Sequence, residues 1–176
     1  MILTIGHSTR PEKDFIELLK QHSIQTLVDV RTLPRSRWNP QFNSTSMQKS
    51  LPAARIEYLH EPQLGGLSEP SSNSINTGWK NPGFRGYADY MQTGQFEIAI
   101  LRVMELSEKR LIALMCAEAD YTKCHRQLLA DALTVRSVKV VHVIDHTQTK
   151  FHALTSFAKV AGSTITYPAD QSKLEF

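Results

Sequence analysis

The most informative run of the chain is LIALMCAEADYTKCHR, residues 111–126. Its first five residues are apolar, a pattern that predicts a short strand buried on both faces in the centre of a parallel sheet. Apolar residues at helical spacing then predict a helix over 124–134. A strand followed closely by a helix is the repeating unit of parallel α/β sheets, so this run predicts the class of fold.

The same alternation continues on both sides of this run. Strands are predicted at 2–5, 26–30, 56–59 and 138–144, and helices at 9–22, 44–51 and 95–108. Thr9 and Glu12 have the spacing of a capping box, which predicts that the first helix begins at Thr9. We therefore expect a three-layer Rossmann-like or flavodoxin-like α/β domain with a mostly parallel sheet. In such folds ligands bind beyond the carboxyl ends of the strands.

Two segments do not fit the alternation. Residues 65–83 are rich in serine, asparagine and glycine and are longer than the ~12–15 residues usual for loops, which indicates either a functional lid or a mobile insertion. The tail from His146 onward predicts a weak helix and a strand over 163–167. We expect residues 1–176 to form a single α/β domain, with a core over 1–145 and a C-terminal extension over 146–176.

The composition excludes several classes of protein. The chain has 176 residues, of which 41% are hydrophobic and 21% charged, and its apolar runs are far shorter than the ~20 residues of a membrane-spanning helix. A strand predicted directly after Met1 leaves no room for a signal peptide, so we expect a cytoplasmic protein that does not contact the membrane. Two cysteines are too few for a disulfide framework. The net charge of +3 falls well short of a strongly basic nucleic-acid-binding domain.

Polar residues follow the first two predicted strands. Gly6 permits a tight turn, after which His7 stands either in a binding site or simply in the turn. Asp29 is a carboxylate in an apolar strand and must be paired, with Arg31 as the obvious partner. That ion pair is either structural or part of a site. The basic segment over 35–38 would suit a phosphate group and a stacked base.

The densest set of reactive side chains is Cys116, Glu118, Cys124, His125 and Arg126. A cysteine near a helix N-terminus, beside a histidine and an arginine, is typical of thiols with a lowered pKa and predicts a nucleophile or an anion cradle. Both cysteines could instead be buried apolar filler. Zinc bound by Cys116, Cys124 and His125 is sterically conceivable, but the Cys-x7-Cys spacing matches no zinc signature, so we assign no metal ligand.

Common cofactor motifs are missing from the sequence. It contains neither a Gly-x-Gly-x-x-Gly fingerprint nor a Walker A motif, which disfavours dinucleotide and P-loop binding, and no cofactor is assigned. His142 lies inside an apolar strand and is expected to be a core residue, whereas Asp145 and His146 at its end are weak site candidates.

Several separated blocks of the sequence resemble the family known as domain of unknown function 488. The blocks are residues 4–10, 28–31, 34–36, 42–43, 64–66, 84–91, 115–118 and 124–126. They span roughly residues 1–144 and leave the tail uncovered. The resemblance implies an α/β fold but brings no established activity. Carried over residue by residue, it implies a site made of His7, Ser8, Arg10, Asp29, Arg31, Arg35, Tyr87, Cys116, Glu118, Cys124, His125 and Arg126.

These residues support three hypotheses, none of which predicts the oligomeric state. The first is an enzyme acting on a phosphate-bearing substrate, a nucleotide or a nucleic-acid component. Its chemistry would fall to Cys124, His125, Glu118, Asp29 and His7, and its anion contacts to Ser8, Arg10, Arg31, Arg35, Tyr87, Cys116 and Arg126. The second is a non-catalytic nucleic-acid-binding module that uses Arg31, Arg35, Arg37, Lys80 and Arg85, with Trp38 or Trp79 for stacking. The third is a structural or regulatory protein with a structural metal site.

Overall fold

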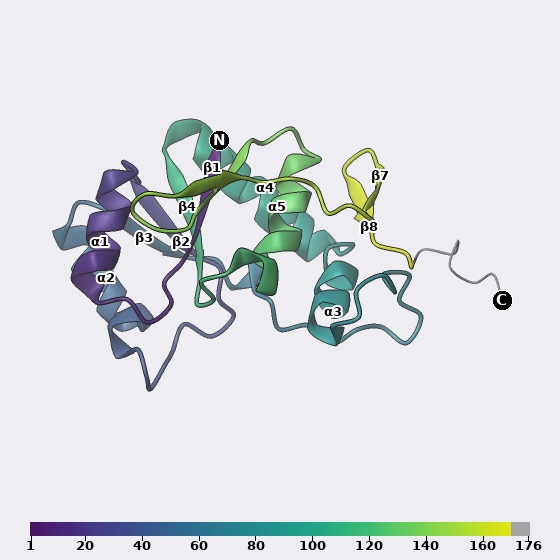
Figure 1. The fold of residues 1–176 in the computed structure, drawn as a ribbon, viewed down its shortest axis with the longest axis horizontal. Helices are drawn as coiled ribbons and strands as arrows, with labels where there is room; N and C mark the ends of the chain where they lie inside the picture. Colours follow the sequence, from purple (N-terminus) through teal and green to yellow (C-terminus); the bar gives the residue numbers. More distant parts are fainter. Residues whose placement is uncertain (170–176) are drawn as a thin grey trace.

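A six-stranded sheet forms the centre of the computed structural model, which describes residues 1–169 (Figure 1). The strands are β1 (Ile2–Gly6), β2 (Thr26–Asp29), β3 (Glu57–His60), β4 (Ile112–Cys116), β5 (Val140–Val143) and β6 (Thr149–Phe151), in the order β3-β2-β4-β1-β5-β6. The first five are parallel, and β6 runs antiparallel to β5. The mostly parallel sheet is confirmed, and β4 lies near its centre as its apolar run predicts.

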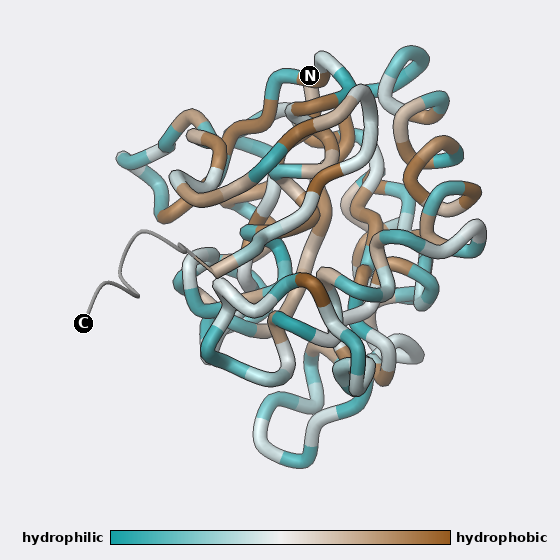
Figure 2. Tube along the Cα trace, turned by 90° about the vertical axis from the view of Figure 1, so that its right-hand side faces the viewer, coloured by the Kyte–Doolittle hydropathy of each residue, from teal (hydrophilic) through white to brown (hydrophobic). Residues whose placement is uncertain are grey.

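Helices cover both faces of this sheet, which gives the predicted three layers (Figure 1). One face carries α1 (Glu12–Gln21) and α2 (Ser44–Ala53), and the other carries α3 (Pro82–Tyr90), α4 (Gly94–Lys109) and α5 (Arg126–Thr134). Apolar side chains of α1, α2, α4 and α5 join the strands in the two hydrophobic cores, whereas α3 packs against α5. Figure 2 shows this as an alternation of hydrophobic and hydrophilic segments along the helical turns. None of the helices over residues 1–169 is long and apolar enough to cross a membrane.

The neighbouring strands β1 and β4 send the chain to opposite faces of the sheet. After β1 the chain enters α1, whereas after β4 it enters α5 on the other face. The two connections diverge, and in open α/β sheets ligands bind in the crevice at such a switch point. Gly6 and Cys116 pair in register at the carboxyl ends of these strands. The topology therefore positions both residues at the edge of that crevice.

Two helices begin later than the sequence predicts. The capping box at Thr9 is wrong, because α1 begins at Glu12 with Pro11 at its N-cap and no side-chain capping bond. Ser8 has φ +52°, so the chain turns sharply before the helix. Likewise α5 begins at Arg126, because a short 3-10 turn over Tyr121–Lys123 leaves Cys124 in extended backbone. Similar 3-10 turns lie at Pro40–Phe42 and Pro62–Leu64.

The segment over 65–83 is irregular, as predicted, but it is attached to the rest of the fold. The Asp89 carboxylate on α3 accepts hydrogen bonds from Ser71 N (2.9 Å), Ser74 Oγ (2.7 Å) and Asn76 Nδ2 (2.7 Å). Asn76 is fully buried, and its Oδ1 accepts a hydrogen bond from Tyr167 N at 2.8 Å. These buried contacts argue against a freely mobile insertion.

The tail contains the strand predicted over 163–167, which is β8 (Thr164–Thr166), but strands and no helix elsewhere in its described residues. Besides β6, it forms a hairpin of β7 (Lys159–Ala161) and β8. Tyr167 is fully buried, and its hydroxyl donates to Asp131 Oδ2 at 2.9 Å. The C-terminal extension therefore contributes to the core. Its last residues, 170–176, lie outside the described part of the chain.

A chain of buried polar groups runs through His142, from Thr4 on β1 to Asp131 on α5. Its Nδ1 lies 2.6 Å from Thr4 Oγ1, and its Nε2 lies 3.0 Å from Nδ1 of His152, which in turn contacts Asp131 at 2.7 Å. The His142 ring also stacks on Tyr121, with ring centroids 3.6 Å apart. His142 is fully buried. It is thus the satisfied core histidine that the sequence predicts.

We expect His142 to make the protein less stable in acid. Burial, followed by repulsion from His152, Arg126 and Lys150, lowers the pKa of His142 to about 3. In the unfolded chain His142 is protonated below pH ~6.5, whereas in the folded protein it stays neutral down to about pH 3. The free energy of unfolding therefore falls as pH falls from about 6.5 to 3. Between pH 7 and pH 5, His142 should lower the free energy of unfolding by about 2 kcal/mol. Urea unfolding at both pH values measures it.

The variant His142→Asn separates this histidine from the other titrating groups. Its unfolding free energy should depend on pH less steeply than that of the wild type by about the same 2 kcal/mol. An identical pH dependence in both proteins would show that folding does not lower the pKa of His142.

Candidate functional site

A cavity of about 610 Å³ lies at the carboxyl ends of β1 and β4. Its wall contains eight of the residues that the sequence and the family resemblance single out, namely His7, Ser8, Arg31, Arg35, Cys116, Glu118, Cys124 and His125. These residues come from the turn after β1, the segment after β2, the end of β4 and the start of α5. The fold therefore gathers residues that are far apart in the sequence around one cavity.

The floor of the cavity is built by backbone contacts between the turns after β1 and β4. His7 N donates to Cys116 O at 3.0 Å, and Ser8 N donates to Ala117 O at 2.9 Å. Gly6 allows this approach, because a Cβ there would overlap the Glu118 carbonyl oxygen and lie 2.7 Å from its carbon. The two turns are thereby held side by side, each presenting side chains to the cavity.

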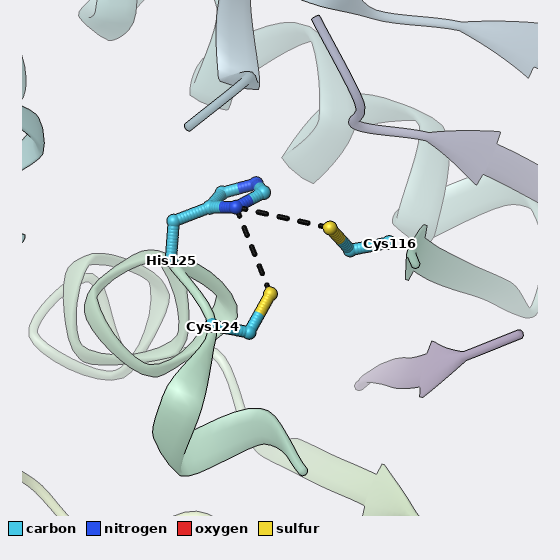
Figure 3. A group of neighbouring side chains, drawn as sticks. All are labelled: Cys116, Cys124 and His125. Atoms are coloured by element: carbon cyan, nitrogen blue, oxygen red, sulfur yellow. Dashed lines mark hydrogen bonds between the residues drawn. The ribbon is translucent and has the colours of Figure 1, made fainter. Parts of the chain in front are cut away.

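Cys116, Cys124 and His125 form a cluster in this cavity (Figure 3). The His125 Nδ1 atom lies 3.7 Å from Cys124 Sγ and 3.9 Å from Cys116 Sγ, and all three atoms lie within 4.8 Å of one another. Gly66 packs against the imidazole, since a Cβ at Gly66 would lie 2.7 Å from the ring Cγ. The 65–83 segment therefore limits the movement of the His125 ring from one side.

Cys116 and Cys124 shift each other's pKa in opposite directions. A hydrogen bond from Cys116, aided by His125 and Arg126, holds the pKa of Cys124 well below that of a free thiol, against the effect of burial. The same hydrogen bond to Cys124, together with burial, raises the pKa of Cys116. Of the two thiols, Cys124 is therefore the one that loses its proton more readily. The predicted influence of His125 and Arg126 is among the causes, but the predicted helix N-terminus is not, because Cys124 does not lie in the first turn of α5.

Asp29 and Arg31 form a buried ion pair next to the cavity. Arg31 Nε and Nη2 donate to the two carboxylate oxygens at 2.8 and 2.6 Å, and the Tyr58 hydroxyl donates to Asp29 Oδ2 at 2.8 Å. Arg31 Nη2 also donates to Phe42 O at 2.7 Å. The predicted pairing is confirmed. Since Asp29 neutralises Arg31, this arginine adds little net charge to the cavity.

His7 is held neutral in the cavity wall. Its Nδ1 lies 2.7 Å from Ser8 O, which makes Nδ1 the protonated nitrogen and leaves Nε2 to accept from Arg31 Nη1 at 3.1 Å. The ring stacks on Phe42 with centroids 4.2 Å apart. Burial lowers the pKa of His7 to about 4. Both ring nitrogens of His7 are therefore engaged, one with the backbone and one with Arg31.

Four of the predicted site residues lie behind the cavity wall and support it. Asp29 is fully buried beneath Arg31, and Tyr87 is fully buried with its hydroxyl donating to Leu64 O at 3.0 Å. Arg10 donates to the carbonyls of Gly6 and Ile144, both at 2.6 Å. Arg126 is 1% exposed and donates to the carbonyls of Glu118 and Ala119. It therefore fixes the turn after β4 instead of facing the cavity.

Sequence reasoning missed several residues of the wall. They include Asn39, Asn81, Phe84 and Lys123. Asn81 caps α3 by accepting hydrogen bonds from Gly83 N and Phe84 N at 2.8 and 3.3 Å, a local signal that could have placed it at a helix start. Lys123 is adjacent to Cys124 and adds an exposed cation. Only the fold brings the start of α3 to this cavity.

The fold and the cavity together define an α/β protein with a crevice at the carboxyl ends of its parallel strands. The chain belongs to the family described as domain of unknown function DUF488, whose family model matches residues 12–133. This range contains β2, β4 and the Cys116–Cys124–His125 cluster, and it begins after β1. Searches of curated proteins and of solved structures found no match.

Proposed function

We propose that this protein is an enzyme that acts on a small phosphate-bearing substrate in the cavity above β1 and β4. The observation that carries the proposal is the composition of one wall, in which nucleophilic, acid–base and cationic side chains converge at the switch point of the sheet. Such convergence at the position where α/β sheets bind ligands favours catalysis over a purely structural role.

Two exposed cations support an anionic substrate. Arg35 follows β2 and Lys123 precedes α5, and both line the cavity from opposite connections. Lys123 Nζ lies 3.9 Å from Asp120 Oδ2. Such an exposed ion pair holds the lysine side chain only weakly. Glu118 is the acidic side chain of the wall. Because Arg31 is already neutralised by Asp29, we assign the contacts with the substrate's phosphate to Arg35 and Lys123.

The chemical step is assigned to the Cys116–Cys124–His125 cluster in the cavity wall. The sulfur of Cys124 serves as the nucleophile and lies beside His125. Glu118 is exposed on the same wall and supplies a carboxylate for proton transfer. Asp29 and His7 then act as positioning residues for Arg31.

One observation supports the alternative of a nucleic-acid-binding module. Trp38 is 91% exposed and lies beside Arg37, in the segment that supplies Arg35 to the cavity. An exposed indole among cations is suited to stacking on a base. Trp79 does not offer a similar surface, because it packs against Phe84, Phe157 and Tyr167.

Calorimetric titration with inorganic phosphate and with a nucleoside monophosphate tests the proposal. We expect both to bind the wild type, and Arg35→Ala and Lys123→Ala each to weaken binding about 10-fold, the effect of losing ~1.4 kcal/mol from a charge-assisted contact. Lys13→Ala is the matched control, since Lys13 is 90% exposed on α1 and should bind as the wild type does. Arg126 is unsuitable for this test because its removal disturbs the turn itself.

Two results would contradict an enzyme for small phosphates. Failure of both ligands to bind would favour a structural or regulatory protein. Tight binding of a single-stranded oligonucleotide, but not of the monophosphate, with a log–log salt slope of ~0.7 per neutralised phosphate, would favour the nucleic-acid-binding module.

A further inference from the structure

We infer that Cys116, Cys124 and His125 bind one divalent metal ion, of which zinc is the best fit, with the fourth coordination position open to the cavity. The inference goes beyond the proposed function, because metal binding requires no substrate. The spacing of the two cysteines matches no zinc signature in the sequence. The structure nevertheless brings three ligand atoms together from the end of β4 and the start of α5 (Figure 3).

The distances within the cluster suit a tetrahedral ion. Zinc bound at ~2.3 Å from sulfur and ~2.1 Å from nitrogen would hold its ligand atoms ~3.6–3.8 Å apart. The His125 Nδ1 atom lies 3.7 and 3.9 Å from the two sulfurs. An ion could therefore bind with only small movements of the three side chains.

The orientation of the His125 ring suits metal coordination through Nδ1. Its Nδ1 faces the two sulfurs, and its Nε2 is buried with no hydrogen-bond partner within residues 1–169. If the ring proton is on Nε2, the Nδ1 lone pair points between the sulfurs. Tyr87 and Gly66 confine the ring, with the Tyr87 and His125 centroids 5.1 Å apart. Such confinement fixes the position of the His125 ring before an ion binds.

The charges and the surroundings also suit a metal that takes part in a reaction. Two thiolates neutralise a divalent cation, so a loaded site would bury little net charge. All three ligands line the same cavity. Zinc sites with three protein ligands and an open fourth position are typical of catalysis, whereas structural zinc sites have four protein ligands. The open position would hold water or a substrate oxygen.

Metal binding changes the role of Cys124. Its sulfur would donate its lone pair to the ion and would no longer act as the nucleophile. The metal-loaded and metal-free proteins therefore differ in one property that can be measured directly, the reactivity of the two thiols toward an alkylating reagent. This difference needs no knowledge of the substrate.

Titration of the reduced, metal-free protein with Zn²⁺ in competition with a chromogenic chelator tests the site. We expect one equivalent to bind, and Cys116→Ser, Cys124→Ser and His125→Gln each to lower the affinity more than about 100-fold. Such a loss exceeds the range of about 10–100-fold for residues that only hydrogen-bond a metal ligand. His146→Gln is the matched control, since this histidine binds Asp14 and Gln21 on the surface. Co²⁺ should give the intense visible absorption of a tetrahedral site with thiolate ligands.

A second measurement needs no variant and remains valid if a replacement prevents folding. One equivalent of Zn²⁺ should protect both cysteines of the wild type from iodoacetamide, and a chelator should restore labelling. Absence of stoichiometric Zn²⁺ binding, or unchanged alkylation in its presence, would overturn the inference. Phosphate titration of the metal-free protein tests Arg35 and Lys123 separately, so failure of one proposal is distinguishable from failure of the other.

Discussion

Replacing Asp29 by asparagine is expected to lower the free energy of unfolding by about 3–5 kcal/mol, because it leaves the Arg31 guanidinium buried without its counter-charge. The carboxylate is fully buried and binds Arg31 through both oxygens at 2.8 and 2.6 Å. Asparagine has nearly the same shape, so the loss reports charge rather than packing. Urea unfolding monitored by circular dichroism measures it.

Asp14→Asn provides the matched control for this prediction. Asp14 pairs with His146 at 2.8 Å, but its side chain is 41% exposed. Exposed ion pairs contribute about 0–1 kcal/mol, so this variant should be nearly as stable as the wild type. Equal stability losses in both variants would mean that the Asp29–Arg31 pair is not a buried support of the cavity.

Gly6→Ala is expected to have an effect of similar size, a loss of about 3 kcal/mol or more. The added methyl group would overlap the Glu118 carbonyl oxygen and lie 2.9 Å from Ala119 Cα, so backbone rather than a flexible side chain would have to move. Overpacking usually costs ~1–3 kcal/mol, and the rigid surroundings place this position at the upper end. Thermal and urea unfolding both measure the loss.

Gly94→Ala is the control for steric overlap. Gly94 is the first residue of α4, and a Cβ there has no neighbour within 4 Å. Alanine lowers the conformational entropy of the unfolded chain, so this variant should be at least as stable as the wild type. A Gly6→Ala protein as stable as Gly94→Ala would show that the turns after β1 and β4 do not pack as described.

Much of the fold could be predicted because its signals are local. The apolar run over 111–115 identified the strand near the sheet centre, and the alternation of strands and helices identified the parallel sheet. The need of Asp29 for a partner identified Arg31 two residues later. These predictions depend only on residues near in sequence or on the general topology of α/β sheets.

The remaining features depend on contacts between distant segments. Arg126 appeared to be an anion ligand, but the carbonyls of Glu118 and Ala119 take up its guanidinium once the turn after β4 has formed. The extended conformation of Cys124 follows from the short 3-10 turn before α5, which the apolar periodicity of the helix does not reveal. Likewise, only the fold places Asn81 and Phe84 in the cavity wall.

The geometry of the Cys116–Cys124–His125 cluster also depends on contacts between distant segments. Cys116 and Cys124 are eight positions apart, and the sequence alone left nucleophile, filler and metal ligand as alternatives. In the structure both sulfurs lie beside one histidine nitrogen and on the wall of one cavity. This arrangement gives each alternative a different experimental result.

The most direct test of the central claim is a crystal structure of the reduced protein grown with inorganic phosphate. The proposal predicts a phosphate ion in the cavity at the carboxyl ends of β1 and β4, in contact with Arg35 or Lys123 and facing the Cys116–Cys124–His125 cluster. A cavity that is closed, or that holds no anion at a phosphate concentration that saturates binding in solution, would contradict it.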